Sequence, residues 1–174
     1  METFIGLIDS GLGGRNTLPQ NTKYHQYKPE TYVSYGTMTD GELLKELGHH
    51  FKYLLNLNVG DVYVGCYTLS CLIDRLSIYF WPQRVHTMLD ILDVDSFDTV
   101  IGTPKTCDYF SKTHNVIPCP HLAYQIENNQ KIILPEYQQP VGRLLIGCTH
   151  YYQIKNLINT KYSPTSLQTP VFSL

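Results

Sequence analysis

The chain has 174 residues, of which 43% are hydrophobic and 16% are charged, and its net charge is −2. This length suits one compact domain or two small lobes, and the composition supports a substantial core. The charge balance and the short apolar runs argue against a nucleic-acid partner or a membrane span, and METFIGLIDSGLGG lacks the features of a signal peptide. We therefore expect a cytoplasmic protein.

The predicted elements alternate between strands and helices along the chain. Strands are expected at 4–9, 61–65, 85–89, 98–102, 143–147 and 169–174. Helices are expected at 41–57, 69–80, 103–112, 121–129 and 149–158. The clearest helix is 41–57, because Leu43, Leu47, Phe51 and Leu54 recur at helical spacing. This alternation predicts an α/β fold with a mainly parallel sheet.

Five cysteines are present, at positions 66, 71, 107, 119 and 148. In the cytoplasm they are expected as thiols, and the odd number agrees with that. Since no CxxC pair or zinc-type spacing occurs, no metal site is predicted. We interpret Cys71, Cys107 and Cys119 as small buried hydrophobic residues.

Chemically active side chains follow four predicted strands. The four turns begin with Asp9-Ser10, Cys66-Tyr67-Thr68, Thr103-Pro104-Lys105-Thr106 and Cys148-Thr149-His150. Ligands of parallel sheets bind at the carboxyl ends of strands. The helix N-termini that follow suit a carboxylate and favour a thiolate. The two cysteine turns are alike, which indicates two related half-units that face each other.

Two cysteines placed in this way suit the inversion of a stereocentre without a cofactor. One thiolate would remove a proton from one face of a carbon, and one thiol would return a proton to the other face. Asp9 and His150 could polarise the two groups. An N-capping role for Asp9 and a core or capping role for His150 are the structural alternatives.

Five segments of the chain resemble the glutamate racemases of the cofactor-independent aspartate/glutamate racemase superfamily. IGLIDSGLGG resembles the family's I-G-x-x-D-S-G-x-G-G, and LLIGCTHYY resembles its L-x-L-G-C-T-H-Y-P. VYVGCYTLS, GTPKT and CPHLAYQIE are similar to the family's V-x-A-C-N-T-A-S, its threonine-rich turn and its C-P-x-x-x-x-x-x-E segment. The segments occur in family order and cover nearly the whole chain.

The resemblance implies roles for particular residues. Cys66 and Cys148 would be the catalytic bases, assisted by Asp9 and His150. The residues that would bind the substrate are Ser10, Tyr67, Thr68, Thr103, Thr106, Thr149, Tyr35 and Gly36. The ligand would be a small acidic amino acid, glutamate first, with no cofactor; a homodimer stays open.

The sequence departs from the family pattern at several positions. Tyr67 replaces an asparagine that helps to bind substrate, and Tyr152-Gln153 follows the last motif where the family has proline. The family's Pro-Tyr-Gly motif corresponds either to Tyr35-Gly36 or to Asp40-Gly41. The chain is also shorter than usual members, mainly between positions 127 and 141, and lacks their C-terminal helix.

The resemblance implies two similar lobes with the active site in the cleft between them. We expect a discontinuous first lobe, 1–85 plus 150–174, and a shortened second lobe, 86–149. Three other functions stay open: racemisation of aspartate or another small acid, a catalytically impaired relative that binds a ligand or a protein, and a decarboxylase or isomerase reaction on the same cysteines.

Overall fold

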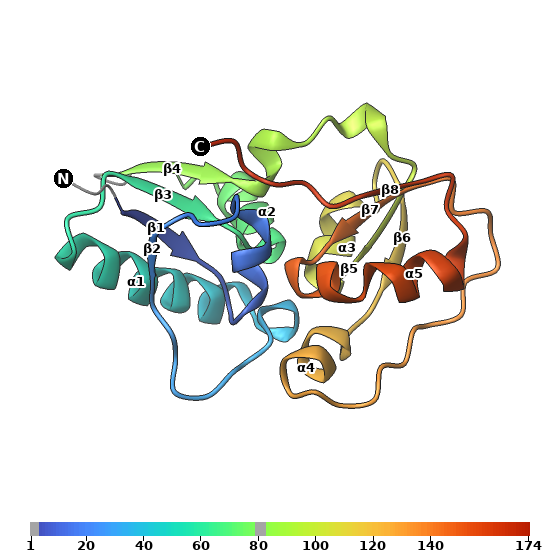
Figure 1. The fold of residues 1–174 in the computed structure, drawn as a ribbon, viewed down its shortest axis with the longest axis horizontal. Coiled ribbons are helices and arrows are strands. Elements are labelled where there is room, and N and C mark those ends of the chain that lie inside the picture. The colour runs from blue at the N-terminus through green and yellow to red at the C-terminus, as the bar shows by residue number, and fades with distance from the viewer. Residues whose placement is uncertain (1–3, 79–82) are drawn as a thin grey trace.

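The computed structural model describes residues 4–78 and 83–174 and contains two four-stranded sheets (Figure 1). The first sheet has the order β2-β1-β3-β4, with strands Tyr24–Gln26, Ile5–Ile8, Asp61–Val64 and Arg84–Thr87. The second has the order β6-β5-β7-β8, with strands Asn115–Pro118, Thr99–Gly102, Arg143–Gly147 and Ser166–Gln168. All the recorded pairings are parallel. Taken in chain order, both sheets follow the same 2-1-3-4 arrangement, so the prediction of two similar α/β lobes is confirmed.

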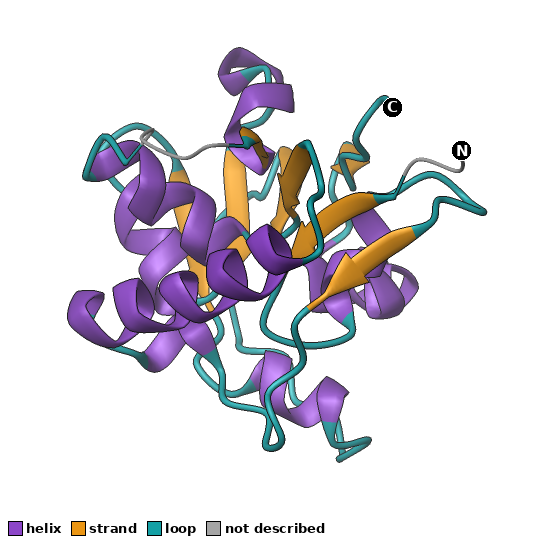
Figure 2. Ribbon diagram, turned by 90° about the vertical axis from the view of Figure 1, so that its left-hand side faces the viewer, coloured by secondary structure: helices purple, strands orange, loops and turns teal. Residues whose placement is uncertain are grey.

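Helices flank the strands of both sheets (Figure 2). The α-helices are α1 (Asp40–Asn56), α2 (Tyr67–Arg75), α3 (Pro104–Phe110), α4 (Leu122–Glu127) and α5 (Lys155–Tyr162). Short 3₁₀ turns lie at Gly13–Thr17, Tyr35–Thr37, Met88–Ile91, Val94–Ser96 and Thr149–Ile154. None of the helices in the described ranges is long and apolar enough to cross a membrane.

Helix α1 illustrates how the sequence specifies its elements. Thr39 and Glu42 form a reciprocal capping box at its N-terminus. Leu43, Leu47 and Leu54 point into the core and are at most 1% exposed. The helical spacing of leucines therefore marks the buried face, as the sequence predicts.

Several predicted boundaries are wrong. The helix predicted at 69–80 is α2, which begins at Tyr67 and ends at Arg75; Ser77 then takes a left-handed conformation, with φ 52°. Residues 79–82, the end of that prediction, lie outside the described residues. The helix predicted at 149–158 is a 3₁₀ turn followed by α5, and strands β2 and β6 are additional elements.

The C-terminal segment corrects both the last predicted strand and the expected lobe division. The last strand is β8, at Ser166–Gln168 rather than at 169–174, and it pairs with β7 in the second sheet. Pro170 has no N–H to donate to a ladder, which disfavours a strand through that position. Strand β8 therefore belongs to the second sheet rather than to the first lobe, and the final tail then returns to the first lobe (Figure 1).

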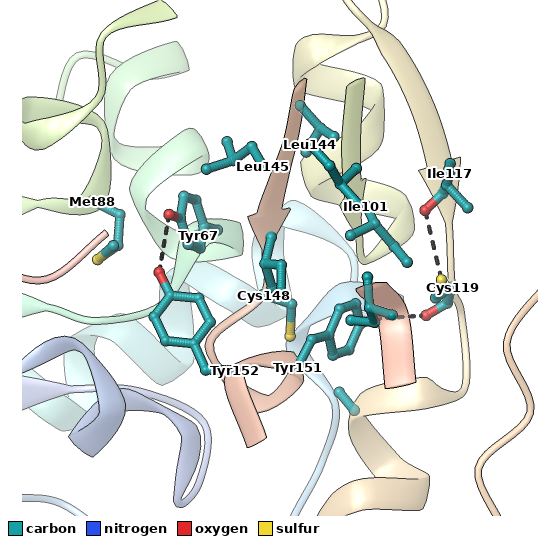
Figure 3. Close-up of a cluster of buried hydrophobic side chains, with 14 of the residues drawn as sticks. Tyr67, Met88, Ile101, Ile117, Cys119, Leu144, Leu145, Cys148, Tyr151 and Tyr152 are labelled. Atoms are coloured by element: carbon teal, nitrogen blue, oxygen red, sulfur yellow. Dashed lines mark hydrogen bonds between the residues drawn. The ribbon is translucent and has the colours of Figure 1, made fainter. Parts of the chain in front are cut away.

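The two lobes share one hydrophobic core. A single cluster of buried side chains includes Leu7, Tyr67 and Met88 from the first lobe, together with Ile101 and Leu144 from the second (Figure 3). A separate cluster lies beneath α1 in the first lobe. The shared cluster joins the two lobes and includes Tyr67 and Cys148 from the turns that carry the predicted site residues.

Candidate active site

A small cavity lies between the lobes at the carboxyl ends of β1, β3, β5 and β7. Its lining includes all of the predicted site residues except Thr106: Asp9, Ser10, Tyr35, Gly36, Cys66, Tyr67, Thr68, Thr103, Cys148, Thr149 and His150. Of the two candidates for the glycine motif, Tyr35-Gly36 lines the cavity, whereas Asp40 begins α1. The structure thus assembles in one place residues that are spread over most of the chain.

The cavity is closed in this conformation. Its volume is about 10 Å³, which is roughly enough for one water molecule, since a water needs about 10–15 Å³ by this measure. Pockets that hold small ligands usually enclose about 300–1,000 Å³. An amino acid could therefore enter only after the walls of the cavity move apart.

The two cysteines occupy equivalent places in their lobes. Cys66 follows β3 and is the N-cap residue of α2, and Cys148 follows β7 and is the N-cap residue of the 3₁₀ turn after it. Both are buried, with 6% and 7% of their surfaces exposed. Burial, and then the charge of Asp9, raise the pKa of Cys66 well above its ordinary value. Cys66 is therefore a neutral thiol in this closed conformation.

His150 forms a buried ion pair beside Cys148. Its Nε2 lies 2.6 Å from Oε2 of Glu127, which also accepts a hydrogen bond from the Leu12 N–H at 3.3 Å. Burial lowers the pKa of His150, but its hydrogen bonds to Cys148 and Glu127 outweigh burial and raise that pKa to about 10. The same hydrogen bond lowers the pKa of Glu127. At neutral pH the pair is imidazolium and carboxylate, with the positive charge next to the Cys148 sulfur.

Asp9 presents an unused oxygen. Its Oδ2 accepts the Gly14 N–H at 2.6 Å, while Oδ1 is buried without a hydrogen-bond partner in the described part of the chain. Burial raises the pKa of Asp9 to about 6, although the nearby His150 charge opposes this. Gly14 permits the close approach, because a Cβ there would lie 2.5 Å from Cβ of Asp9. An unpaired buried carboxylate oxygen suits an ammonium group.

Three threonine hydroxyls join the lobes at another wall of the cavity. Oγ1 of Thr68, in α2, lies 2.9 Å from Oγ1 of Thr103, which caps α3. Thr106 lies behind this pair, and its Oγ1 is 3.1 Å from that of Thr103. Thr106 therefore supports the wall but does not line the cavity, unlike the other predicted residues.

Sequence reasoning missed several residues of the site. Tyr32, Ser34, Ala123 and Gly147 also line the cavity, and Glu127 completes the ion pair. Glu127 was detectable, because it ends the CPHLAYQIE segment. Tyr32 lies in an irregular stretch whose pattern predicts nothing, yet its ring centroid is 5.5 Å from that of His150 and its hydroxyl is buried without a partner among the described residues.

Tyr67 lies at the cavity, as predicted, but its hydroxyl points elsewhere. The hydroxyl oxygen is 3.2 Å from that of Tyr152, the other tyrosine that departs from the family motifs (Figure 3). Only 1% of Tyr67 is exposed. Its ring therefore forms part of the wall.

The chain is similar in sequence to glutamate racemases. No protein-family model matches the chain. Glutamate racemase from Trichodesmium erythraeum is 25% identical over 199 residues, which cover 90% of this chain and 70% of the relative. Glutamate racemase from Streptococcus thermophilus is 25% identical over 196 residues, which cover 88% of this chain and 69% of the relative.

Solved structures show the same fold. Glutamate racemase from Francisella tularensis, in complex with D-glutamate, superposes with a TM-score of 0.76 at 21% identity, covering 97% of this chain and 76% of that one. Glutamate racemase from Campylobacter jejuni gives a TM-score of 0.74 at 17% identity, and the match covers 95% of this chain and 80% of that one. Aspartate racemase from Picrophilus torridus gives a TM-score of 0.59 at 12% identity, and the match covers 95% of this chain and 88% of that one. The architecture is thus the two-lobed fold of aspartate and glutamate racemases, in a shorter chain.

Proposed function

Because the chain is a shortened and divergent relative of the glutamate racemases, we propose that it is a cofactor-independent amino-acid racemase that interconverts L- and D-glutamate. The observation that carries this proposal is the shared cavity of Cys66 and Cys148, each placed at the end of an equivalent strand in its lobe. We place the reaction in the cytoplasm and leave a homodimer open.

The two thiols would act on opposite faces of the substrate's Cα. Cys66 removes the Cα proton from one enantiomer while Cys148 donates a proton to the other face, and the roles reverse for the other enantiomer. Each direction requires one thiolate and one thiol, since only the thiolate is an effective base. The imidazolium of His150 would lie beside the Cys148 sulfur, and the buried Cys66 would supply the thiol.

The remaining cavity groups fit an amino-acid ligand. The free Oδ1 of Asp9 would accept the substrate's ammonium group. Hydroxyls of Ser10, Thr68, Thr103 and Thr149, with the helix N-termini beside them, would hold carboxylates. Fixed donors at the α-carboxylate also stabilise the negative charge that develops when Cα loses its proton.

Proton exchange at Cα tests this reaction directly. The wild-type protein, incubated in D2O with L- or D-glutamate, should replace the Cα proton by deuterium, as NMR shows. Cys66→Ser and Cys148→Ser should each lose about 10²–10⁴-fold in racemisation, the usual contribution of a general acid or base. Cys119→Ser is the matched control, because Cys119 is buried and donates to the Ile117 carbonyl away from the cavity.

The two serine variants should also differ from each other. With β-substituted glutamate analogues, the remaining cysteine can still remove a proton from its own enantiomer, and loss of the β-substituent follows. Cys66→Ser and Cys148→Ser should therefore prefer opposite enantiomers. Full racemase activity in both variants would remove the cysteines from the mechanism.

Tyr67 favours a second candidate, racemisation of aspartate or another small acid, because a buried phenol ring takes up wall space at the cavity. The same D2O assay with aspartate compares the two substrates. If the wild type exchanges no acidic amino acid but binds one in calorimetry, the chain is an impaired relative that acts as a binding module. Release of CO2 without exchange would indicate the decarboxylase alternative.

A further inference from the structure

Tyr67 and Tyr152 form a hydrogen-bonded chain whose direction is determined by its last member. Tyr152 Oη donates to the carbonyl of Pro170 at 2.9 Å. A carbonyl can only accept, so this bond uses the single hydroxyl proton of Tyr152. In the 3.2 Å contact between the two phenols, Tyr67 is therefore the donor. This series of hydrogen bonds runs from the Tyr67 hydroxyl through the Tyr152 hydroxyl to the backbone of the C-terminal tail.

This direction determines what Tyr67 offers to the cavity. Its one hydroxyl proton is used on Tyr152, and Tyr152 lies beside Cys148 on the side opposite Tyr151 (Figure 3). Tyr67 therefore contributes the apolar part of its ring to the cavity lining rather than a hydrogen-bond donor. Tyr67 and Tyr152 are only 1% and 8% exposed, so their hydrogen bonds are shielded from solvent.

The acceptor at the end of the chain is itself held in place. Two residues beyond Pro170, the Phe172 N–H donates to the Thr17 carbonyl at 2.8 Å. The Phe172 ring packs edge-on against Tyr63 of β3, with centroids 5.0 Å apart. The tail is thus fixed to the first lobe, and the Pro170 carbonyl has a fixed position relative to the strand that leads to Cys66.

We propose that Tyr152 is a positioning residue that holds the Tyr67 ring as a fixed wall of the cavity and thereby limits the length of the acidic side chain the site accepts. This inference rests on the proposed racemase function for its substrate class. If this one wall stays in place while the cavity opens, it excludes an added methylene, and one methylene changes discrimination by about 10–200-fold in a closely fitting pocket. Aspartate is one methylene shorter than glutamate, so the held ring lowers the ratio of glutamate to aspartate turnover relative to a site in which the ring can move.

The first test compares kcat/KM for glutamate and aspartate in D2O exchange. Tyr67→Phe keeps the ring but removes the donor, and Tyr152→Phe removes both bonds of the chain. Both variants should raise the ratio of kcat/KM for glutamate to kcat/KM for aspartate, and Tyr152→Phe should raise it by about tenfold. The change should come mainly from a lower KM for glutamate. Tyr162→Phe is the matched control. Tyr162 lies at the end of α5, away from the cavity, and its hydroxyl also donates to a proline carbonyl, that of Pro135, at 2.8 Å. An unchanged ratio in both variants, or an equal rise in Tyr162→Phe, overturns the proposal.

A second measurement does not need turnover. 2-Bromosuccinate and 2-bromoglutarate match the two amino acids in length and alkylate a cysteine when the thiolate sulfur displaces bromide from C2. Peptide mapping by mass spectrometry gives the rates at Cys66 and Cys148. Tyr152→Phe should raise the bromoglutarate-to-bromosuccinate rate ratio severalfold and Tyr162→Phe should not. Absence of Cα exchange in the wild type would reject the racemase function, whereas an unchanged alkylation ratio would reject the role of Tyr152.

Discussion

Glu127 belongs to the site through its hydrogen bond to the buried His150. Its carboxylate is 14% exposed and the imidazole is 2% exposed, so solvent screens the pair only weakly. Hydrogen bonds to charged groups contribute about 1.5–3 kcal/mol. We therefore regard Glu127 as the residue that keeps His150 cationic beside Cys148.

Glu127→Gln should slow Cα exchange by about tenfold or more, since about 1.4 kcal/mol corresponds to tenfold in rate. The neutral amide can no longer stabilise the imidazolium, so the His150 pKa should fall below about 10. NMR titration of the imidazole checks this directly. Glu136→Gln is the control, because Glu136 pairs with Lys161 at an exposed site. An unchanged His150 titration in Glu127→Gln would contradict the assignment.

The raised pKa of His150 predicts that the stability of the protein depends on pH. The His150 pKa rises from an ordinary 6.5 to about 10 in the folded state, so the folded protein binds more protons between these values. Its stabilising contribution is complete below about pH 6.5 and is lost as the pH rises toward 10. Urea denaturation between about pH 6.5 and 8, below the range where unfolded thiols ionise, should show falling stability. His150→Gln should flatten the dependence of the free energy of unfolding on pH. An equally steep dependence in this variant would show that His150 is not its cause.

Among the elements, the 3₁₀ turn at Tyr35–Thr37 packs closely against the start of α3 in the other lobe. A Cβ on Gly36 would lie only 2.4 Å from Cβ of Thr103. Gly36, one of the two candidates for the motif glycine, therefore has a physical role, because it lets the turn pack against Thr103, the residue that caps α3. The hydroxyl contact between Thr103 and Thr68 depends on this packing.

Gly36→Ala should destabilise the protein by about 1–3 kcal/mol, the usual cost of forcing extra volume into a packed contact. It should also reduce Cα exchange, because Thr103 must move. Gly48→Ala is the opposite control: a Cβ there meets no atom within 4 Å, and the change should stabilise α1 by about 0.5–1 kcal/mol. Urea denaturation measures both changes. Equal effects of the two substitutions would contradict the packing argument.

For the whole molecule, the C-terminal tail and the shared core join the two lobes. The tail leaves β8 in the second sheet and places Phe172, 3% exposed, against the first lobe (Figure 1). The largest core cluster contains residues of both lobes. We therefore expect both lobes to unfold in one cooperative transition.

Phe172→Ala should lower the free energy of unfolding by about 3–5 kcal/mol, as is typical when a buried phenylalanine is truncated. The neighbouring Val171 is 47% exposed, so Val171→Ala should change stability by less than about 0.5 kcal/mol. Thermal and urea denaturation give both values. Two separated transitions in the wild type, or a negligible effect of Phe172→Ala, would show that the tail and the common core do not couple the lobes.

The sequence by itself determined the α/β class, helix α1 and the strand-end turns that carry Asp9, Cys66, Thr103 and Cys148. These features depend on local patterns: apolar periodicity, capping residues and motifs confined to a few positions. Strands β2 and β6 were missed because only one residue of the two strands is buried, so neither shows the apolar run that marks the central strands. The roles of the site residues stay predictions until exchange is measured.

Only the tertiary structure decided which distant residues meet at the site. Glu127 contacts Leu12 across 115 positions, and Tyr67 contacts Tyr152 across 85. It also decided that β8 pairs with β7 and that the tail after β8 returns to the first lobe. Local preferences carry no information about such contacts, because they form only when the packing of two whole lobes brings the side chains within hydrogen-bonding distance.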